Sequence, residues 1–135
     1  MSHYTVMETR LKDVDALVEA LSDMGYDELE VYDKPRPLVE FVGGEPNQRA
    51  NVIIRKQYVG RLSNDIGFRL GSDGRFEAII SDYDQDRHND RWMAELTKRY
   101  AYHATRTKLE EQGFTLTHEQ RDNQGRVHLL LQRAG

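Results

Sequence analysis

The sequence predicts an α+β fold, in which an antiparallel sheet carries two helices on one face as a two-layer sandwich. Three observations support this prediction. The chain has 135 residues, the size of a single domain, and no linker divides it. Two segments place apolar residues at helical spacing. Around them, segments that alternate apolar and polar residues are joined mostly by short turns, which favours antiparallel pairing.

The chain opens with a predicted strand at residues 4–11, which are rich in β-branched and aromatic types. Asp13 then has the character of an N-cap, and the spacing predicts a helix over residues 13–24. Gly25 follows at the position where a left-handed residue ends a helix. We expect the apolar stripe of this helix to pack on the sheet. Its members are Val14, Leu17, Val18, Leu21 and Met24.

The middle of the chain is less regular. A short alternating strand is expected at residues 28–32. Residues 34–48 hold all 3 prolines, so we expect a long loop there, interrupted by a short edge strand at residues 38–42. Loops of this length often have a function or move, and a surface insertion without a function is an equal alternative. A further strand is expected at residues 51–57.

A hairpin follows, in which residues 66–70 and 76–80 alternate on either side of a turn at residues 71–74. The Asp-Gly pair of this turn is typical of tight hairpin connections. Acidic residues then lead into a long helix, which the spacing predicts over residues 90–112. Gly113 ends this helix in the way that Gly25 ends the first.

A second hairpin ends the chain, with strands at residues 114–116 and 127–131 and a turn at residues 122–125. Helices therefore separate groups of strands. This order predicts a ferredoxin-like two-layer sandwich with an extra hairpin.

Composition excludes several classes of protein. The net charge is -4, from 19 basic and 23 acidic residues, which makes nucleic acid an unlikely partner. No apolar run approaches the roughly 20 residues of a membrane helix, and the N-terminal residues do not form a signal peptide. The sequence contains no cysteine, so disulfides and thiolate metal sites are excluded. We therefore expect a cytoplasmic protein without membrane contact.

Acidic side chains alternate just before the long helix, at Asp82, Asp84, Asp86 and Asp90. A calcium loop of the EF-hand type begins with this spacing. Here an arginine replaces the glycine of the sharp turn and a methionine replaces the bidentate glutamate. The sequence therefore favours an interaction of these carboxylates with the positive end of the helix, and we predict no metal site.

The apolar stripe of the long helix contains Tyr100 and His103, with Trp92 beside it. These three residues are the candidates for a ligand-binding site, and His103 has the pKa range for acid–base chemistry. No second catalytic group stands at a diagnostic spacing, so we assign no catalytic residue and no cofactor. We expect His103 to be structural, as a core histidine with a hydrogen-bond partner in apolar surroundings. His118 and His128 lie on the two predicted strands of the last hairpin and could face one another, but a metal site would need a further ligand.

A second candidate site lies on the other side of this helix. Tyr100 and Tyr102 are two residues apart, so they point about 200° apart, and we expect Tyr100 inside and Tyr102 outside. An exposed aromatic beside arginines has the composition of an interface hot spot. The predicted interaction face consists of Arg99, Tyr102, Arg106 and Leu109. A partly covered tyrosine without a partner is the alternative.

Short motifs along nearly the whole chain resemble a single family, in the same order. They are Met1-Ser2-His3-Tyr4, Asp65-Ile66-Gly67-Phe68, Phe76-Glu77-Ala78-Ile79-Ile80-Ser81-Asp82, Arg99-Tyr100-Ala101-Tyr102-His103, Gln112-Gly113-Phe114 and the ending Gly125-Arg126-Val127-His128-Leu129-Leu130-Leu131-Gln132-Arg133. The chain thus resembles the hypothetical chloroplast reading-frame family numbered thirty-five, a domain of unknown function. It departs from that family after Asp82, where tryptophan or other bulky residues are usual and Tyr83 and a run of acids stand here. It also departs at Ala134, where an aromatic residue is usual, and in the loop at residues 34–48.

The resemblance implies no reaction. It does imply protein partners, because members of this family are thought to accompany ATPases of the AAA class and small ferredoxin-type proteins. The sequence therefore favours a non-catalytic adaptor with a protein partner, and the resemblance implies a partner of one of these two kinds. A small-molecule or metal-binding protein is the alternative, and an enzyme is the least favoured class.

Overall fold

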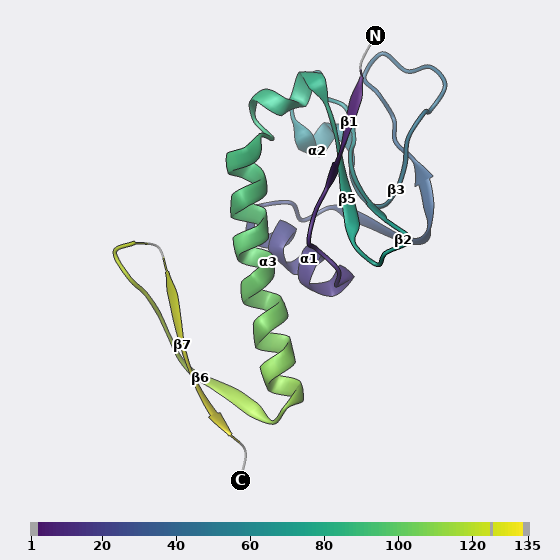
Figure 1. Ribbon diagram of the computed structural model, residues 1–135. Helices are drawn as coiled ribbons and strands as arrows, with labels where there is room; N and C mark the ends of the chain where they lie inside the picture. The colour runs from purple at the N-terminus through teal and green to yellow at the C-terminus, as the bar shows by residue number, and fades with distance from the viewer. Residues whose placement is uncertain (1–2, 125, 134–135) are drawn as a thin grey trace.

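The computed structural model describes residues 3–124 and 126–133. Its main part is a five-stranded antiparallel sheet in the order β1-β5-β4-β3-β2 (Figure 1). The strands of this sheet are β1 (Tyr4–Glu8), β2 (Leu29–Pro37), β3 (Arg49–Ile54), β4 (Ile66–Leu70) and β5 (Phe76–Ser81). A separate two-stranded sheet consists of β6 (Phe114–Arg121) and β7 (Val127–Arg133). The helices are α1 (Val14–Asp23), the short α2 (Lys56–Val59), the 3-10 helix η1 (Asp82–Asp86) and α3 (Asp90–Glu111).

The predicted α+β two-layer architecture is confirmed, with α1 and α3 packed against each other over one face of the sheet. Strands β2 to β5 form a meander, and β1 lies beside β5. Because four antiparallel pairings separate β1 from β2, these two strands run parallel at opposite edges of the sheet. In a ferredoxin-like β-α-β-β-α-β order the strand after the second helix rejoins the sheet, whereas here β6 pairs with β7 in the described part of the chain.

Helix α1 forms as its sequence predicts. The Asp13 carboxylate accepts a hydrogen bond from the Asp15 backbone N–H at 2.9 Å, so Asp13 is the N-cap. At the other end Gly25 adopts a φ of 100°, which a residue with a side chain disfavours. Leu17 and Leu21 are fully buried against the sheet, as the apolar stripe predicts.

The opposite face of the sheet has a smaller apolar cluster of Leu38, Ala50, Ile53 and Ile79. The chain after β2 covers this face, and Leu38 packs directly over Gly67 of β4. A Cβ atom on Gly67 would lie 2.9 Å from Leu38 Cδ2 and 2.5 Å from Ala50 Cβ. Only a glycine therefore allows this close approach of the loop to the sheet.

Three predictions for this region need correction. The strand expected at residues 28–32 continues to Pro37, because β2 is an edge strand with a register shift between Val31 and Arg36, where prolines need not donate to the ladder. No strand forms at residues 38–42, since the backbone there bonds to the side chains of Asn64 and Asp65 instead. The strand expected at residues 51–57 ends at Ile54, and α2 follows it.

The predicted hairpin of β4 and β5 is confirmed, with Gly74 of its turn at a φ of 81°. Helix α3 begins after the N-cap Asn89, whose side chain accepts from the Trp92 backbone N–H at 3.1 Å. Its C-terminal half extends past the sheet and carries the β6–β7 hairpin beside it (Figure 1). The turn of that hairpin includes residue 125, which lies outside the described residues. Within residues 3–124 and 126–133, every helix is too short or too polar to cross a bilayer.

Candidate functional site

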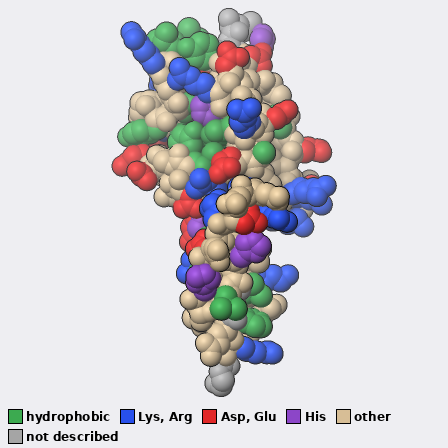
Figure 2. Space-filling model, turned by 90° about the vertical axis from the view of Figure 1, so that its left-hand side faces the viewer, with side chains coloured by type: hydrophobic (Ala, Val, Ile, Leu, Met, Phe, Trp, Pro, Cys, Tyr) green, Lys and Arg blue, Asp and Glu red, His purple; other side chains and the backbone are tan. Residues whose placement is uncertain are grey.

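The C-terminal half of α3 and the hairpin beside it enclose a groove of about 680 Å³. This part of the molecule is a narrow extension below the sandwich (Figure 2). The helix contributes one wall and β7, with its preceding turn, the other. The groove is lined by Lys98, Ala101, Tyr102, Thr105, Gln124, Arg126, Val127, His128 and Leu129.

Tyr102 spans the gap between α3 and β6. Its hydroxyl donates to Glu119 Oε2 of β6 at 3.2 Å and accepts from Arg106 Nη1 at 3.2 Å. Arg106 also donates to Glu110 Oε1 at 2.9 Å, one turn further along the helix. Tyr102 is therefore half-buried, and the side that the sequence places in solvent is covered in part by the chain's own hairpin. Helical periodicity cannot show this, because the position of the hairpin depends on contacts between distant segments.

Arg99 lines a small hollow together with Tyr102 but bonds elsewhere, since it donates to Glu95 Oε1 of α3 at 2.7 Å and to the Asp23 carbonyl of α1 at 3.5 Å. Leu109 is half-buried and is not part of the groove lining. The structure thus brings Tyr102 and Arg106 together by a direct hydrogen bond, while Arg99 and Leu109 flank them.

Two charged side chains line the groove, Lys98 and Arg126; both are basic, and His128 lies with them. Behind them Asp122 Oδ2 accepts from Arg126 Nε at 3.1 Å and lies 3.0 Å from His128 Nε2. The hydrogen bond from His128, with help from Arg126, lowers the pKa of Asp122 to about 2. Since Ala101, Val127 and Leu129 supply apolar surface between these groups, the groove suits a segment with both apolar and acidic side chains.

The three residues of the alternative ligand site are engaged inside the protein. The Tyr100 hydroxyl accepts from the backbone N–H groups of Lys12 and Asp13, each at 2.9 Å, so Tyr100 lies inside as predicted. Trp92 Nε1 donates to the Tyr26 hydroxyl at 3.1 Å. These contacts join α3 to α1 and to the chain on either side of it.

His103 lies between two carboxylates of α1. Its Nδ1 is 3.0 Å from Glu19 Oε2 and its Nε2 is 2.6 Å from Asp23 Oδ2. The expectation of apolar surroundings for His103 is therefore wrong, because α1 presents its acidic edge, not its apolar stripe, to this position of α3. Both ring nitrogens are occupied, which makes the histidine a link between the two helices.

The acidic stretch before α3 is divided by the fold. Asp84 is buried and accepts from the Asn64 backbone N–H at 3.0 Å and from Ser81 Oγ at 2.8 Å, whereas Asp82 and Asp86 are exposed. Among the described residues, no group of three or more His, Asp or Glu side chains is placed to hold a metal ion.

The two histidines of the last hairpin are not opposite one another. His118 pairs across from Leu130, and His128 from Gln120. The two histidines therefore do not face one another, because the register places His128 two residues along β7 from the partner of His118.

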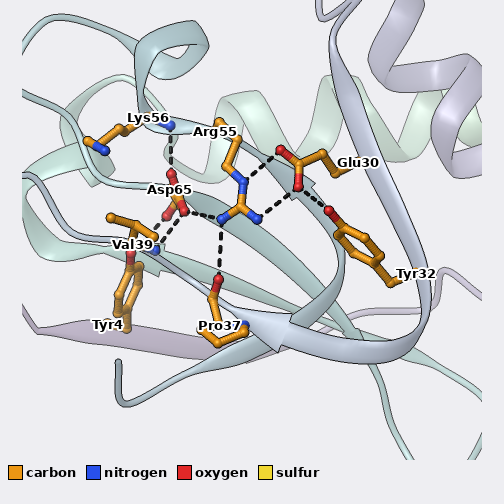
Figure 3. A network of polar contacts seen from close by, with 8 residues as sticks. All are labelled: Tyr4, Glu30, Tyr32, Pro37, Val39, Arg55, Lys56 and Asp65. Carbon is orange, nitrogen blue, oxygen red and sulfur yellow. Dashed lines mark hydrogen bonds and ion pairs between the residues drawn. The ribbon is translucent and has the colours of Figure 1, made fainter. Parts of the chain in front are cut away.

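An ion network on the loop face of the sheet was not foreseen from the sequence (Figure 3). Asp65 is fully buried; its Oδ2 accepts from Arg55 Nη1 at 2.8 Å and from the Val39 N–H at 2.6 Å, and its Oδ1 accepts from the Lys56 N–H at 2.7 Å. Arg55 also holds Glu30 through two hydrogen bonds of 2.8 Å. This network fixes the loop after β2 to the ends of β3 and β4.

Protonation states follow from these contacts. Hydrogen bonds from Arg55 and Tyr32 lower the pKa of Glu30 to about 2 against the effect of burial, and Glu30 and Asp65 raise the pKa of Arg55. Burial raises the pKa of Tyr4, whose hydroxyl donates to the Asp65 carbonyl at 3.0 Å. Glu30 and Arg55 therefore stay charged and paired, which is the state of a structural element and not of a proton-transfer site.

Comparison with known proteins gives the family. The model of the family described as "Protein of unknown function (DUF1257)" matches residues 20–130. The chain belongs to this family. Its curated relatives include uncharacterized ycf35 proteins of Pyropia yezoensis, 26% identical over 137 residues, and of Guillardia theta, 28% identical over 138 residues.

Each of these alignments covers 98% of both chains, as does that with the ycf35 protein of Cyanophora paradoxa, which is 23% identical over 136 residues. No solved structure shows a significant match. The resemblance to the hypothetical chloroplast reading-frame family thirty-five is thus confirmed, and the DUF1257 family brings no activity with it.

Proposed function

We propose that this DUF1257 member is a non-catalytic interaction domain that works as an adaptor for a larger assembly. The observation that carries the proposal is the groove between α3 and the β6–β7 hairpin, whose lining combines apolar side chains with the basic groups of Lys98, Arg126 and His128. A segment of a partner protein with apolar and acidic side chains fits this chemistry. Tyr102 supplies a half-buried aromatic anchor at its side.

The architecture supports an adaptor in a second way. A two-stranded hairpin is only marginally stable by itself, and here its strands pair with each other and β6 packs on α3. A bound segment would gain contacts to both walls of the groove and would stabilise the hairpin against the helix. The ATPases of the AAA class and the ferredoxin-type proteins that the family resemblance implies are the partners to test first.

The small-molecule or metal-binding alternative has no comparable support. The polar atoms of Tyr100, His103 and Trp92 already have partners inside the protein. An enzyme is not proposed, because the groove brings no nucleophile and base within hydrogen-bond distance of one another among its described lining residues.

The test compares two neighbouring leucines of β7. Leu129 lines the groove, whereas the side chain of Leu130 is 61% exposed on the other side of the strand. The tagged chain and the variants Leu129→Ser and Leu130→Ser are used to capture partners from native cells, and the captured protein is then purified and its Kd is measured. We expect Leu129→Ser to weaken binding at least about tenfold, a change of about 1.4 kcal/mol, while Leu130→Ser binds as the parent does.

A loss of binding in both variants, together with a lower melting temperature, would show that the hairpin and not the groove is being tested. Equal binding by all three proteins would remove the groove from the interaction. Lys98→Glu gives an independent check, because it reverses a charge at the groove edge on the rigid helix and should weaken the binding of an acidic segment.

A further inference from the structure

The end of the sandwich away from the hairpin presents large apolar side chains to solvent. Phe41, Val42, Leu62 and Tyr83 are 53%, 73%, 51% and 56% exposed. They come from three loops that meet there: the loop after β2, the turn before β4 and η1. We call these four residues the loop-tip patch. Figure 2 shows hydrophobic side chains gathered at the upper end of the molecule, beside Lys and Arg side chains.

Buried polar groups beneath the patch hold its three loops in fixed positions. The Asn64 side chain accepts from the Phe41 N–H at 2.8 Å and donates to Ser81 Oγ at 2.9 Å. The Asn64 backbone N–H in turn donates to Asp84 Oδ2 at 3.0 Å, within η1. The Tyr83 hydroxyl reaches back to the Arg61 carbonyl at 3.4 Å. Here the apolar residues are outside and the polar residues inside, which reverses the usual order. Because the hydrogen bonds already hold the loops in place, binding through the patch would cost the loops little conformational entropy.

Leu62 adds a sign of function. Its φ is 62°, and it is the only non-glycine residue with a positive φ among the described residues. This conformation is unfavourable for a leucine, and burial does not offset its cost, because about half of the residue is exposed to solvent. Backbone strain of this kind is common at binding sites, where a partner supplies the missing contacts.

Charges of both signs stand beside the patch. A hollow of about 300 Å³ next to Tyr83 is lined by Arg61 and Arg87 and by Asp82 and Asp86, which are exposed. None of these four forms an ion pair with another described residue. A partner of one charge sign, such as an anionic lipid surface, would leave one pair of these charges covered and unpaired.

We infer that the loop-tip patch binds a second copy of this chain across a two-fold axis. Such an axis places the same surface on both sides of the interface, so that the arginines of one copy face the aspartates of the other in both directions. The apolar tips then pack at the centre and the ion pairs lie at the rim, which is the usual anatomy of an interface. The inference does not depend on the groove, which lies on the extension at the other end of the molecule and stays open in such a dimer.

The first experiment is sedimentation velocity of the full chain from about 1 µM to about 1 mM, a range that covers weak to moderate association. We expect a concentration-dependent dimer. Leu62→Gly removes the side chain but suits the positive φ, so it should fold at least as well as the parent and raise the dimer Kd at least about tenfold. Leu70→Ser is the matched control, since Leu70 is 48% exposed at the far end of β4, and it should dimerise as the parent does.

The second experiment reverses the charges in pairs. One variant carries Arg61→Glu and Arg87→Glu, and the other carries Asp82→Arg and Asp86→Arg. Each should be a monomer alone, and an equimolar mixture should form a heterodimer, which a merely structural role of these residues would not produce.

A parent chain that stays monomeric over the whole range overturns the inference, as does equal dimerisation by Leu62→Gly and the parent. A monomer that sediments with phosphatidylcholine vesicles instead would assign the patch to a lipid surface. Charge-reversed variants that remain apart when mixed would exclude the two-fold pairing.

Discussion

The two faces of the five-stranded sheet are covered in different ways. On the helix face, α1 and α3 bury a large apolar cluster in which Leu17, Leu21 and Phe68 are fully inaccessible. On the loop face, the chain after β2 lies over a much smaller apolar cluster and is held by the ions of Asp65 and Arg55. The first face is stabilised by apolar burial, which has no preferred direction, and the second by hydrogen bonds, which need each partner in place.

The difference explains how residues 34–48, which hold all 3 prolines of the chain, can be held against the sheet. Irregular backbone cannot satisfy its own N–H and C=O groups, so a side chain must do it. Asp65 is that side chain, because one carboxylate accepts from two backbone N–H groups and one guanidinium. The comparison predicts that single changes on the loop face have effects as large as those in the apolar core.

The largest loss of stability should follow Asp65→Ala. The change leaves the Arg55 guanidinium, with a side chain 21% exposed, and the N–H groups of Val39 and Lys56 without their acceptor. Breaking a buried pair in this way costs about 3–5 kcal/mol of unfolding free energy. Urea denaturation measures it, with exposed Asp27→Ala as the control, which should stay within about 0.5 kcal/mol of the parent. A loss no larger than that of the control would mean that apolar packing alone holds the loop.

Leu17→Ala tests the helix face. The side chain is 0% exposed between α1 and the sheet, so its truncation should cost about 2–5 kcal/mol. Hydrogen exchange then distinguishes the two faces. In Leu17→Ala, the difference between the protection of the Val39 amide and the global unfolding free energy should be the same as in the parent, because its acceptor Asp65 lies on the opposite face of the sheet. A loss below about 0.5 kcal/mol would contradict the position of Leu17 in the core.

Gly67→Ala should have an intermediate effect that is confined to the loop face. The new Cβ would meet Ala50 Cβ at 2.5 Å and Leu38 Cδ2 at 2.9 Å, so the loop or the sheet must shift. Overpacking of this kind typically costs about 1–3 kcal/mol. The double variant Gly67→Ala, Leu38→Ala should lose less stability than the sum of the two single losses, since the second change removes one of the two clashes. A double variant that loses the sum of both single effects would exclude this contact.

The smallest effect is a difference in pH dependence between the two faces. On the helix side, burial lowers the pKa of His88, which is 5% exposed beside Tyr26 and Trp92. The unfolded chain therefore binds a proton more readily, and stability should fall as pH drops below about 6.5, the unfolded value. On the loop side, the folded pKa of Glu30 is about 2, so its contribution is present above about 4.5 and lost as pH falls toward 2.

Stability measured from pH 8 to pH 3 checks this order. His88→Gln should flatten the curve in the upper part of the acid range, and Glu30→Gln only in the lower part. Because the Glu30 side chain is 36% exposed, its effect should stay below about 1 kcal/mol. The reverse assignment of the two pH windows would contradict the contacts described for both residues.

The sequence alone determined the elements whose signals are local. The stripe of α1, the N-cap Asp13, the closing Gly25, the hairpin of β4 and β5 and the inward position of Tyr100 all follow from spacings of a few residues, and all are confirmed. Helices and tight turns form by contacts between near neighbours, so their patterns can be read along the chain.

Only the tertiary structure decided the Asp65 network, the ion pairs of His103 and the separation of the last hairpin from the sheet. Arg55 meets Glu30 25 residues away, and His103 meets Asp23 80 residues away. A charged residue carries no periodic signal that names such a partner. Tyr102 shows the same limit: its face of α3 is defined by periodicity, but whether solvent, the hairpin or a partner covers that face depends on the packing of β6, which the sequence around Tyr102 does not contain.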